Sequence, residues 1–133
     1  ASSAGYPRIT SEDLDKGKQY LMMNGKEVFR HAITRFPEVI NECLEKNNLT
    51  PDDIDLLIPH QANLRITQMV QKKLGLKDNQ VFSNIHKYGN TTAGTIPIAM
   101  AEAVNTGKIS KGDIVILAAF GAGFAWGSAA IKW

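Results

Sequence analysis

Cysteine is nearly absent, because the 133 residues contain only Cys43. A single cysteine excludes an internal disulfide and a zinc site built from cysteine ligands, and it is typical of a reducing compartment. We therefore expect a cytoplasmic protein. Cys43 falls on the apolar side of a helical pattern, and nothing beside it in the sequence would activate the thiol. The pattern favours a buried cysteine that packs as a small hydrophobe over a reactive nucleophile.

Long hydrophobic runs and an excess of one charge are also missing. No apolar run reaches the roughly 20 residues that a transmembrane helix needs, and the longest, residues 114–127, is broken by three glycines. Residues 1–7 lack the basic start and apolar stretch of a secretory signal. The net charge of +2 is too small to indicate nucleic-acid binding. We expect no membrane segment, no export and no nucleic-acid partner.

The apolar residues that are present follow helical and strand-like patterns. Helical spacing predicts three helices, over residues 26–46, 64–74 and 93–105. Short apolar runs predict four strands, over residues 55–59, 81–85, 113–120 and 124–132. The third helix is small or apolar on every side, which predicts that it is buried. Strands that alternate with helices and finish in an antiparallel pair predict an α/β fold, with a mixed sheet and helices on its faces.

The chain divides into a short leading segment and one domain. Residues 1–20 are polar, show no apolar period and contain two glycines and a proline, so we interpret them as a loop or boundary segment. Residues 21–133 are long enough to bury a core of their own and form the domain. Within it, residues 86–92 are predicted to form a turn-rich loop.

Two loops that follow predicted strands carry polar side chains suited to binding or catalysis. The first contains His60, in Pro-His-Gln-Ala-Asn over residues 59–63, and the second contains Asn90, in Tyr-Gly-Asn-Thr-Thr over residues 88–92. Ligands of open α/β sheets bind at the carboxyl ends of the strands, so both side chains are candidates for one site. Each also has an ordinary interpretation, His60 as a structural residue at a helix start and Asn90 as a left-handed turn residue. The residues alone leave both interpretations open.

Other kinds of site lack the residues that they need. His60 and His86 have no carboxylate or cysteine at metal-ligand spacing, so we expect no metal. A serine hydrolase would need a Gly-x-Ser-x-Gly motif, which the sequence does not contain. The glycines of residues 121–127 are not followed by a helix that would bind a phosphate. His31 and His86 are expected to be ordinary surface or packing residues.

The two polar loops and the end of the chain together resemble one family. The motifs His-Gln-Ala-Asn (60–63), Tyr-Gly-Asn-Thr-Thr (88–92) and Ala-Phe-Gly-Ala-Gly-Phe-Ala-Trp-Gly-Ser (119–128) are similar to those of β-ketoacyl-acyl-carrier-protein synthase III. The resemblance covers residues 21–133 and implies the C-terminal domain of such a synthase, one half of a thiolase-like fold. The implied enzyme is an acyltransferase that initiates fatty-acid synthesis without a cofactor. It joins an acyl-CoA to malonyl-acyl-carrier-protein and releases CO2 and CoA.

The resemblance implies roles for individual residues. Loss of CO2 from the malonyl group leaves an enolate, and His60 and Asn90 would donate hydrogen bonds to its negative oxygen. A second oxyanion hole, for the carbonyl of the acyl-cysteine, maps to the backbone N–H of Ala122, where the family usually has glycine. Phe120 would line the site beside the nucleophile.

The nucleophile itself is not in this sequence. In the family it is a cysteine of the N-terminal half, and Cys43 matches no catalytic position. We therefore expect the chain alone to be inactive in condensation and to need a cysteine-bearing N-terminal half, with the whole enzyme a homodimer. The alternative is a non-catalytic domain that binds the carrier protein or dimerises. It is disfavoured because such a domain needs no pair of polar residues at strand ends.

A basic helix edge is a candidate docking surface. Arg65 and Lys72 are seven residues apart and share one edge of the second predicted helix, with Lys73 beside them. Composition alone favours an ordinary solvated face. The resemblance implies instead that these three side chains dock the acidic acyl carrier protein. It also places Gly25, Phe29 and Asn63 near the pantetheine arm of the carrier.

Overall fold

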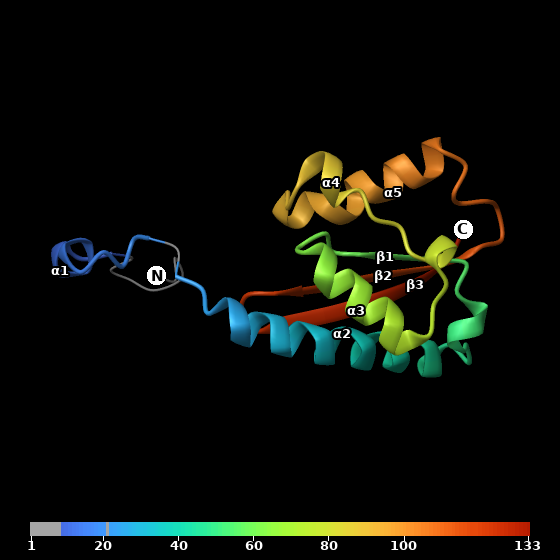
Figure 1. Ribbon diagram of the computed structural model, residues 1–133, viewed down its shortest axis with the longest axis horizontal. Helices are drawn as coiled ribbons and strands as arrows, with labels where there is room; N and C mark the ends of the chain where they lie inside the picture. The colour runs from blue at the N-terminus through green and yellow to red at the C-terminus, as the bar shows by residue number, and fades with distance from the viewer. Residues whose placement is uncertain (1–8, 21) are drawn as a thin grey trace.

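The centre of the molecule is a mixed three-stranded sheet. The computed structural model describes residues 9–20 and 22–133. The strands lie in the order β1 (Leu56–Pro59), β2 (Ile114–Gly121) and β3 (Ala125–Lys132) (Figure 1). β1 pairs in parallel with β2, and β2 pairs antiparallel with β3. The prediction of a mixed sheet that ends in an antiparallel pair is confirmed.

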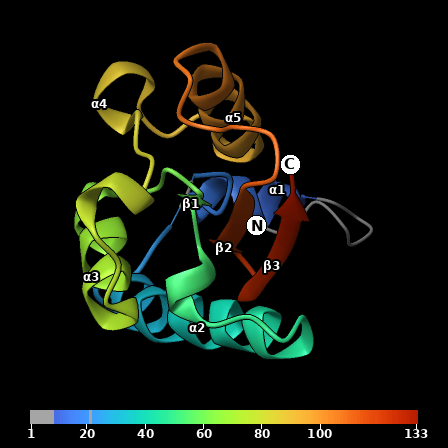
Figure 2. The same cartoon turned by 90° about the vertical axis from the view of Figure 1, so that its right-hand side faces the viewer.

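Helices cover both faces of this sheet. α2 (Gly25–Lys46) and α3 (Leu64–Leu74) lie on one face, and α5 (Thr95–Asn105) lies on the other (Figure 2). The shorter elements are the helices α1 (Ser11–Asp15) and α4 (Ile85–Tyr88) and the 3₁₀ turns η1 (Pro51–Asp53), η2 (Asp78–Gln80) and η3 (Thr92–Gly94). The predicted α/β fold with helices on the faces of the sheet is therefore confirmed.

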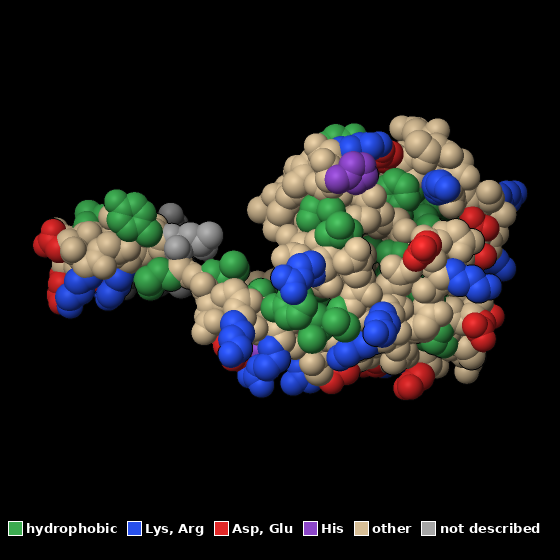
Figure 3. Space-filling view, in the orientation of Figure 1, with side chains coloured by type: hydrophobic (Ala, Val, Ile, Leu, Met, Phe, Trp, Pro, Cys, Tyr) green, Lys and Arg blue, Asp and Glu red, His purple; other side chains and the backbone are tan. Residues whose placement is uncertain are grey.

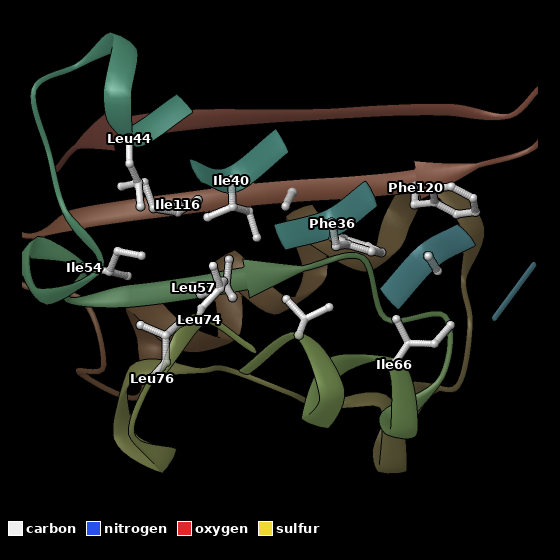
Figure 4. Close-up of a cluster of buried hydrophobic side chains, with 13 residues drawn as sticks. Phe36, Ile40, Leu44, Ile54, Leu57, Ile66, Leu74, Leu76, Ile116 and Phe120 are labelled. Carbon is white, nitrogen blue, oxygen red and sulfur yellow. The ribbon is translucent and has the colours of Figure 1, made fainter. Parts of the chain in front are cut away.

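The strands supply both layers of the core, because successive side chains of a strand point to opposite faces. Leu57 and Ile116 pack with α2 and α3 in the larger cluster, which runs from Leu44 at one end to Phe120 at the other (Figure 4). Leu56, next to Leu57 in β1, faces α5 in the second cluster. β1 is buried along its whole length, as its continuous apolar run predicts.

α2 forms because its sequence combines a cap with one apolar face. The Asn24 side chain accepts a hydrogen bond from the backbone N–H of Glu27 at the start of the helix. Phe36, Ile40 and Leu44 follow at intervals of four and are all buried. These three side chains fix the helix against the sheet, and α2 in turn supports β3, since the Ser128 hydroxyl donates to a backbone carbonyl of α2.

The predicted strand over residues 81–85 is wrong. Val81 makes a single parallel bridge to Leu57, and the chain then turns into α4. The reason is the buried side-chain amide of Gln61. Its oxygen accepts from the Ser83 hydroxyl and from the Asn84 backbone N–H, at 2.8 and 3.3 Å. The Gln61 side chain thus makes the hydrogen bonds that a neighbouring strand would otherwise make to this segment. α4 occupies the first part of residues 86–92, which were predicted to be a loop.

Two further expectations need correction. Within the segment expected to be a loop, residues 11–15 form α1, which the Thr10 side chain caps. This helix lies apart from the sheet (Figure 1). Residues 1–8 lie outside the described residues, and the domain boundary at residue 20 stays a prediction. α5 was expected to be buried on every side, yet its burial is confined to the face with Thr95, Ala99 and Ala103. The opposite face is exposed because the sheet covers only one side of the helix. Within residues 9–20 and 22–133, no helix is long and apolar enough to cross a membrane.

The contact of α2 with the sheet can be tested at Ile40, whose side chain is 0% exposed. Ile40→Ala should lower the free energy of unfolding by about 2–5 kcal/mol, because it removes buried methylene groups and leaves a cavity. Ile40→Val should cost only about 0.5–1.5 kcal/mol. Urea denaturation followed by circular dichroism measures both. The control is Val104→Ala on the exposed face of α5, and an equal loss in that variant would contradict the assignment of the core.

Candidate active site

The position of His60 is set by the pairing of β1 with β2. Its backbone N–H donates to the carbonyl of Ala118 at 2.8 Å, which extends the parallel ladder by one residue beyond the strand. The half-buried imidazole lies with Nδ1 2.5 Å from the hydroxyl oxygen of Thr95, at the start of α5. Burial lowers the pKa of His60, because desolvation disfavours the charged ring. Burial therefore favours the neutral ring.

Asn90 lies in the loop between α4 and α5, where hydrogen bonding fixes its side chain. The amide oxygen accepts from the backbone N–H of Thr92 at 2.9 Å, so the amide nitrogen is left as a donor toward the surroundings. The left-handed residues of this loop are Gly89 and Thr92, with φ of 66° and 54°. The ordinary interpretation of Asn90 as a left-handed turn residue is therefore wrong.

Glu102 of α5 holds the segment that leads to Asn90. Its carboxylate accepts a hydrogen bond from the Asn84 side-chain amide at 2.9 Å and forms an ion pair with Lys87 of α4. The hydrogen bond from Lys87, and then that from Asn84, hold the pKa of Glu102 below its ordinary value. Both partners come from residues 84–88, so the carboxylate fastens α4 onto α5 just before the Asn90 loop.

The His60 and Asn90 loops and the end of the β2–β3 hairpin border an open pocket of about 560 Å³ at the edge of the sheet. Four predicted site residues line it together: His60, Asn90, Phe120 and Ala122. Phe120 is buried, and its ring lies near those of Phe124 and Trp126 with centroids 5.1 and 6.3 Å apart. Ala122 lies in the turn between β2 and β3, and the residues just before α5 complete the wall. The arrangement places two polar side chains opposite an aromatic surface, beside a helix N-terminus.

A second, smaller groove lies between α2 and α3. It has a volume of about 230 Å³ and is lined by Phe29, Arg65, Gln68, Met69 and Lys72. The guanidinium of Arg65 lies 5.8 Å from the centroid of the Phe29 ring, which is within the range of a cation–π contact. Lys and Arg side chains flank an apolar patch on this face of the molecule (Figure 3). Three residues predicted for the carrier protein or its pantetheine arm, Phe29, Arg65 and Lys72, thus meet at one groove.

The other residues predicted for this surface lie outside the groove. Lys73 extends toward α2, where its ammonium donates to the carbonyl of Ile33 at 2.9 Å. Gly25 is the first residue of α2. Asn63 caps α3, and its side-chain oxygen accepts from the backbone N–H of Arg65 at 2.9 Å. Asn63 therefore orients the helix that carries Arg65.

Cys43 and the other two histidines do not line the pocket. Cys43 is half-buried in α2, directly before Leu44, and Leu44 lies at the opposite end of the core from Phe120 (Figure 4). His31 packs against the ring of Phe124 with centroids 5.1 Å apart, and His86 is exposed on α4. Within residues 9–20 and 22–133, no three His, Cys, Asp or Glu side chains are grouped so that they could hold a metal ion.

Sequence reasoning missed three residues that organise the site: Gln61, Thr95 and Glu102. Thr95 and Glu102 are polar residues in an apolar stretch, and Glu102 is the only charged residue in the sequence of α5. That contrast could have identified these two, whereas Gln61 lies in the polar loop 60–63 and carries no such signal. The partners that give them these roles lie 15 to 35 residues away along the chain, so the roles depend on the tertiary structure.

The sequence and the fold match known proteins. A family model described as the C-terminal part of 3-oxoacyl-[acyl-carrier-protein (ACP)] synthase III matches residues 44–133. The chain is similar to a β-ketoacyl-[acyl-carrier-protein] synthase III of Roseiflexus sp. (strain RS-1), with 44% identity over 135 residues, covering 100% of this chain and 41% of that protein. It is also similar to the corresponding synthase of Coxiella burnetii (strain Dugway 5J108-111), with 51% identity over 113 residues, covering 85% of this chain and 35% of that protein.

A solved structure gives the same answer for the fold. The crystal structure of 3-oxoacyl-[acyl-carrier-protein] synthase III from Aquifex aeolicus VF5 superposes with a TM-score of 0.84 and 43% identity, over 86% of this chain and 37% of that chain. The thiolase-like fold expected from the sequence motifs is therefore confirmed. The chain spans about two fifths of the length of the curated relatives that it matches.

The Glu102 contacts predict a pH dependence of stability. Because the folded pKa of this carboxyl is depressed, its contribution is fully present above the unfolded pKa of about 4.3. The contribution is lost as the pH falls through the lower folded value. Glu102→Gln should destabilise the chain at pH 7 and flatten the loss of stability below about pH 4.3, as measured by urea denaturation across that range. The matched control is Glu45→Gln on the exposed side of α2, which should lose stability at acid pH as the wild type does. The same loss in Glu102→Gln would contradict the role of this carboxylate.

Proposed function

This chain belongs to the 3-oxoacyl-acyl-carrier-protein synthase III family, as its C-terminal part, and from that premise we propose that it supplies the decarboxylating side of a condensing active site. One observation carries the proposal. His60 and Asn90, which come from loops 30 residues apart, line one pocket at the N-terminal end of α5. A malonyl thioester held there would find two hydrogen-bond donors where its charge develops.

The chemistry follows from those donors. When the bond between the malonyl α-carbon and its carboxylate breaks, CO2 leaves and the electron pair becomes an enolate. A neutral His60 and the Asn90 amide each donate an N–H to the enolate oxygen, and the positive end of the α5 dipole acts in the same direction. Once a second half covers the pocket, the aromatic wall formed by Phe120 and its neighbours would lower the local dielectric, which would strengthen both hydrogen bonds.

The carbon–carbon bond forms with a partner that carries the acyl group. The enolate carbon attacks the carbonyl of an acyl-cysteine thioester, and the cysteine thiolate leaves. During that step the backbone N–H of Ala122 would donate to the carbonyl oxygen, and an alanine keeps this N–H as well as glycine does. Phe120 would lie beside the cysteine. The overall reaction is that of an acyltransferase that converts acyl-CoA and malonyl-acyl-carrier-protein to 3-oxoacyl-acyl-carrier-protein, CO2 and CoA, without a cofactor.

The exposed surfaces support the need for a second half that supplies the cysteine. β3 is an edge strand of the sheet, and its Trp126 is 44% exposed in the pocket wall. Phe124 beside it is 43% exposed, and the outer face of α5 is apolar and exposed as well. We expect a cysteine-bearing N-terminal half to cover these surfaces, the whole enzyme to be a cytoplasmic homodimer, and this chain alone to be inactive in condensation.

The decarboxylating role is tested by combining the chain with a cysteine-bearing N-terminal half from a related synthase. The assembled pair should release CO2 from malonyl-acyl-carrier-protein. Asn90→Ala and His60→Ala should each lower kcat for this release by about a hundredfold or more, because each removes one oxyanion donor. Radiolabelled CO2 measures the rate, and gel filtration establishes that the two halves have assembled.

The matched control is Asn105→Ala, at the far end of α5, which should leave the rate unchanged. No release from an assembled pair would contradict the proposal. That result would favour the alternative of a non-catalytic domain that binds the carrier protein or dimerises.

The groove between α2 and α3 is proposed to bind the acyl carrier protein. Its basic rim, Arg65 and Lys72, would attract the acidic carrier, and Phe29 would contact the pantetheine arm. Asn63 supports the surface by capping α3, and Gly25 lies at the start of α2 near the arm. Lys73 adds positive charge, although its bond to a carbonyl of α2 turns it away from the rim.

Charge reversal at Arg65 and Lys72 should raise KM for malonyl-acyl-carrier-protein by about tenfold, since each exposed pair contributes on the order of 1 kcal/mol or less. The salt dependence of KM should weaken at the same time, because fewer charges remain to be screened. Steady-state kinetics of the assembled pair at two salt concentrations measures both effects. Lys46→Glu, at the other end of α2, is the control, and an unchanged KM in the double variant would exclude this surface as the dock.

A further inference from the structure

The hydroxyl group of Thr95 has two possible acceptors and one proton. Its oxygen lies 2.5 Å from Nδ1 of His60 and 3.1 Å from the carbonyl oxygen of Thr92. Thr95 is only 2% exposed, so the hydroxyl is shielded from solvent. The direction of this proton decides which nitrogen of His60 carries the ring proton, because a neutral imidazole has one donor and one acceptor nitrogen.

The two acceptors differ in the hydrogen bonds that they already accept from other donors. The Thr92 carbonyl accepts the backbone N–H of Thr95, so it is satisfied without the hydroxyl. Nδ1 of His60 has the Thr95 hydroxyl as its partner at the shorter of the two distances. A hydroxyl that donates to Nδ1 leaves the ring proton on Nε2. Both the hydroxyl and the imidazole then have a partner within the protein.

We propose that Thr95 is a positioning residue that holds His60 in the tautomer protonated at Nε2. The catalytic value of this arrangement rests on the proposed function. With the proton on Nε2, the ring presents a donor to the pocket and can stabilise the enolate oxygen. With the proton on Nδ1, the ring would present a lone pair to the same place and would repel that oxygen. The hydroxyl of Thr95 therefore determines whether His60 acts as a donor at all.

The turn η3, directly before Thr95, lines the pocket, so one short segment supports both donors. Thr95 is the first residue of α5, and η3, which carries Thr92, precedes it directly. The backbone N–H of Thr92 in turn orients the amide of Asn90. His60 and Asn90 are thus both aligned by groups from residues 92–95, which are the turn η3 and the first residue of α5.

Nitrogen NMR of the histidine-labelled chain at pH 7 tests the tautomer directly, with His31→Gln and His86→Gln used to assign the three rings. The wild-type chain and Thr95→Ser, which keeps the hydroxyl, should both show His60 protonated at Nε2. Thr95→Val and Thr95→Ala, which lack the hydroxyl, should both show a population protonated at Nδ1. A wild-type ring protonated at Nδ1 would overturn the proposal, and so would an unchanged tautomer in whichever of the two hydroxyl-free variants folds.

The functional consequence is measured on the assembled pair. Thr95→Val should lower kcat for CO2 release at least about tenfold without raising KM, and by no more than the ~10²–10³ that loss of one oxyanion donor costs. Thr95→Ser should restore the rate. If the wild-type pair released no CO2, the proposed function would fail while the NMR spectra still decided the tautomer. If Asn90→Ala abolished release but Thr95→Val left it unchanged, the positioning role would be refuted and the proposed function would stand.

Discussion

The parallel pairing of β1 with β2 is the constraint on which the rest of the site depends. Parallel strands end at the same edge of a sheet, so the residues that follow them are brought together whatever their separation in sequence. The ladder continues one residue past β1, to the His60 N–H and the Ala118 carbonyl, which fixes the histidine relative to β2. Two strand positions further along β2 is Phe120, and the turn that follows contains Ala122. One register therefore aligns a donor side chain, an aromatic wall and a backbone N–H around a single pocket.

The loop that carries Asn90 is not held by pairing with a strand of the sheet. Side-chain hydrogen bonds hold it in place instead. Gln61 is 1% exposed and bonds to residues 82–84, and Glu102 then fastens residues 84 and 87 to α5. These contacts place the Asn90 loop beside the pocket. The loop contains Thr92 at φ 54°, a backbone conformation that costs a β-branched residue on the order of 1–3 kcal/mol. Such a backbone persists only where its surroundings fix it, and two bonds supply that support: the Asn90 side-chain oxygen accepts from the Thr92 N–H, and the Thr92 carbonyl accepts from the Thr95 backbone N–H.

Much of this structure follows from local patterns in the sequence. α2 was predictable because its apolar period and the Asn24 cap act within one helix, and β2 and β3 because their apolar runs flank a glycine turn. His60 was identifiable as a candidate because it is polar directly after an apolar strand. Asn90 was identifiable through its motif, since the strand predicted before its loop does not form. The segment 81–85 was mispredicted because its hydrogen bonds go to the side chain of Gln61, 22 residues away for Ser83, and no local pattern encodes that partner. Thr95 escaped notice for the same reason, since its hydroxyl gains a role only where α5 meets β1.

Exposure of α5 was mispredicted for a different reason, and that reason bears on the chemistry. A helix that is apolar all round is suited to burial on both sides, yet the described residues cover only one side. Under the proposed function a second half covers the other side and closes the pocket. Closure would further desolvate His60, whose pKa is already lowered by burial, and would hold the ring neutral over a wider pH range. It would also remove water from around the two donors, where each hydrogen bond to a developing enolate is stronger than in solvent. The exposed surface that a second half would cover is therefore also the surface whose burial would strengthen the hydrogen bonds of His60 and Asn90 to the enolate.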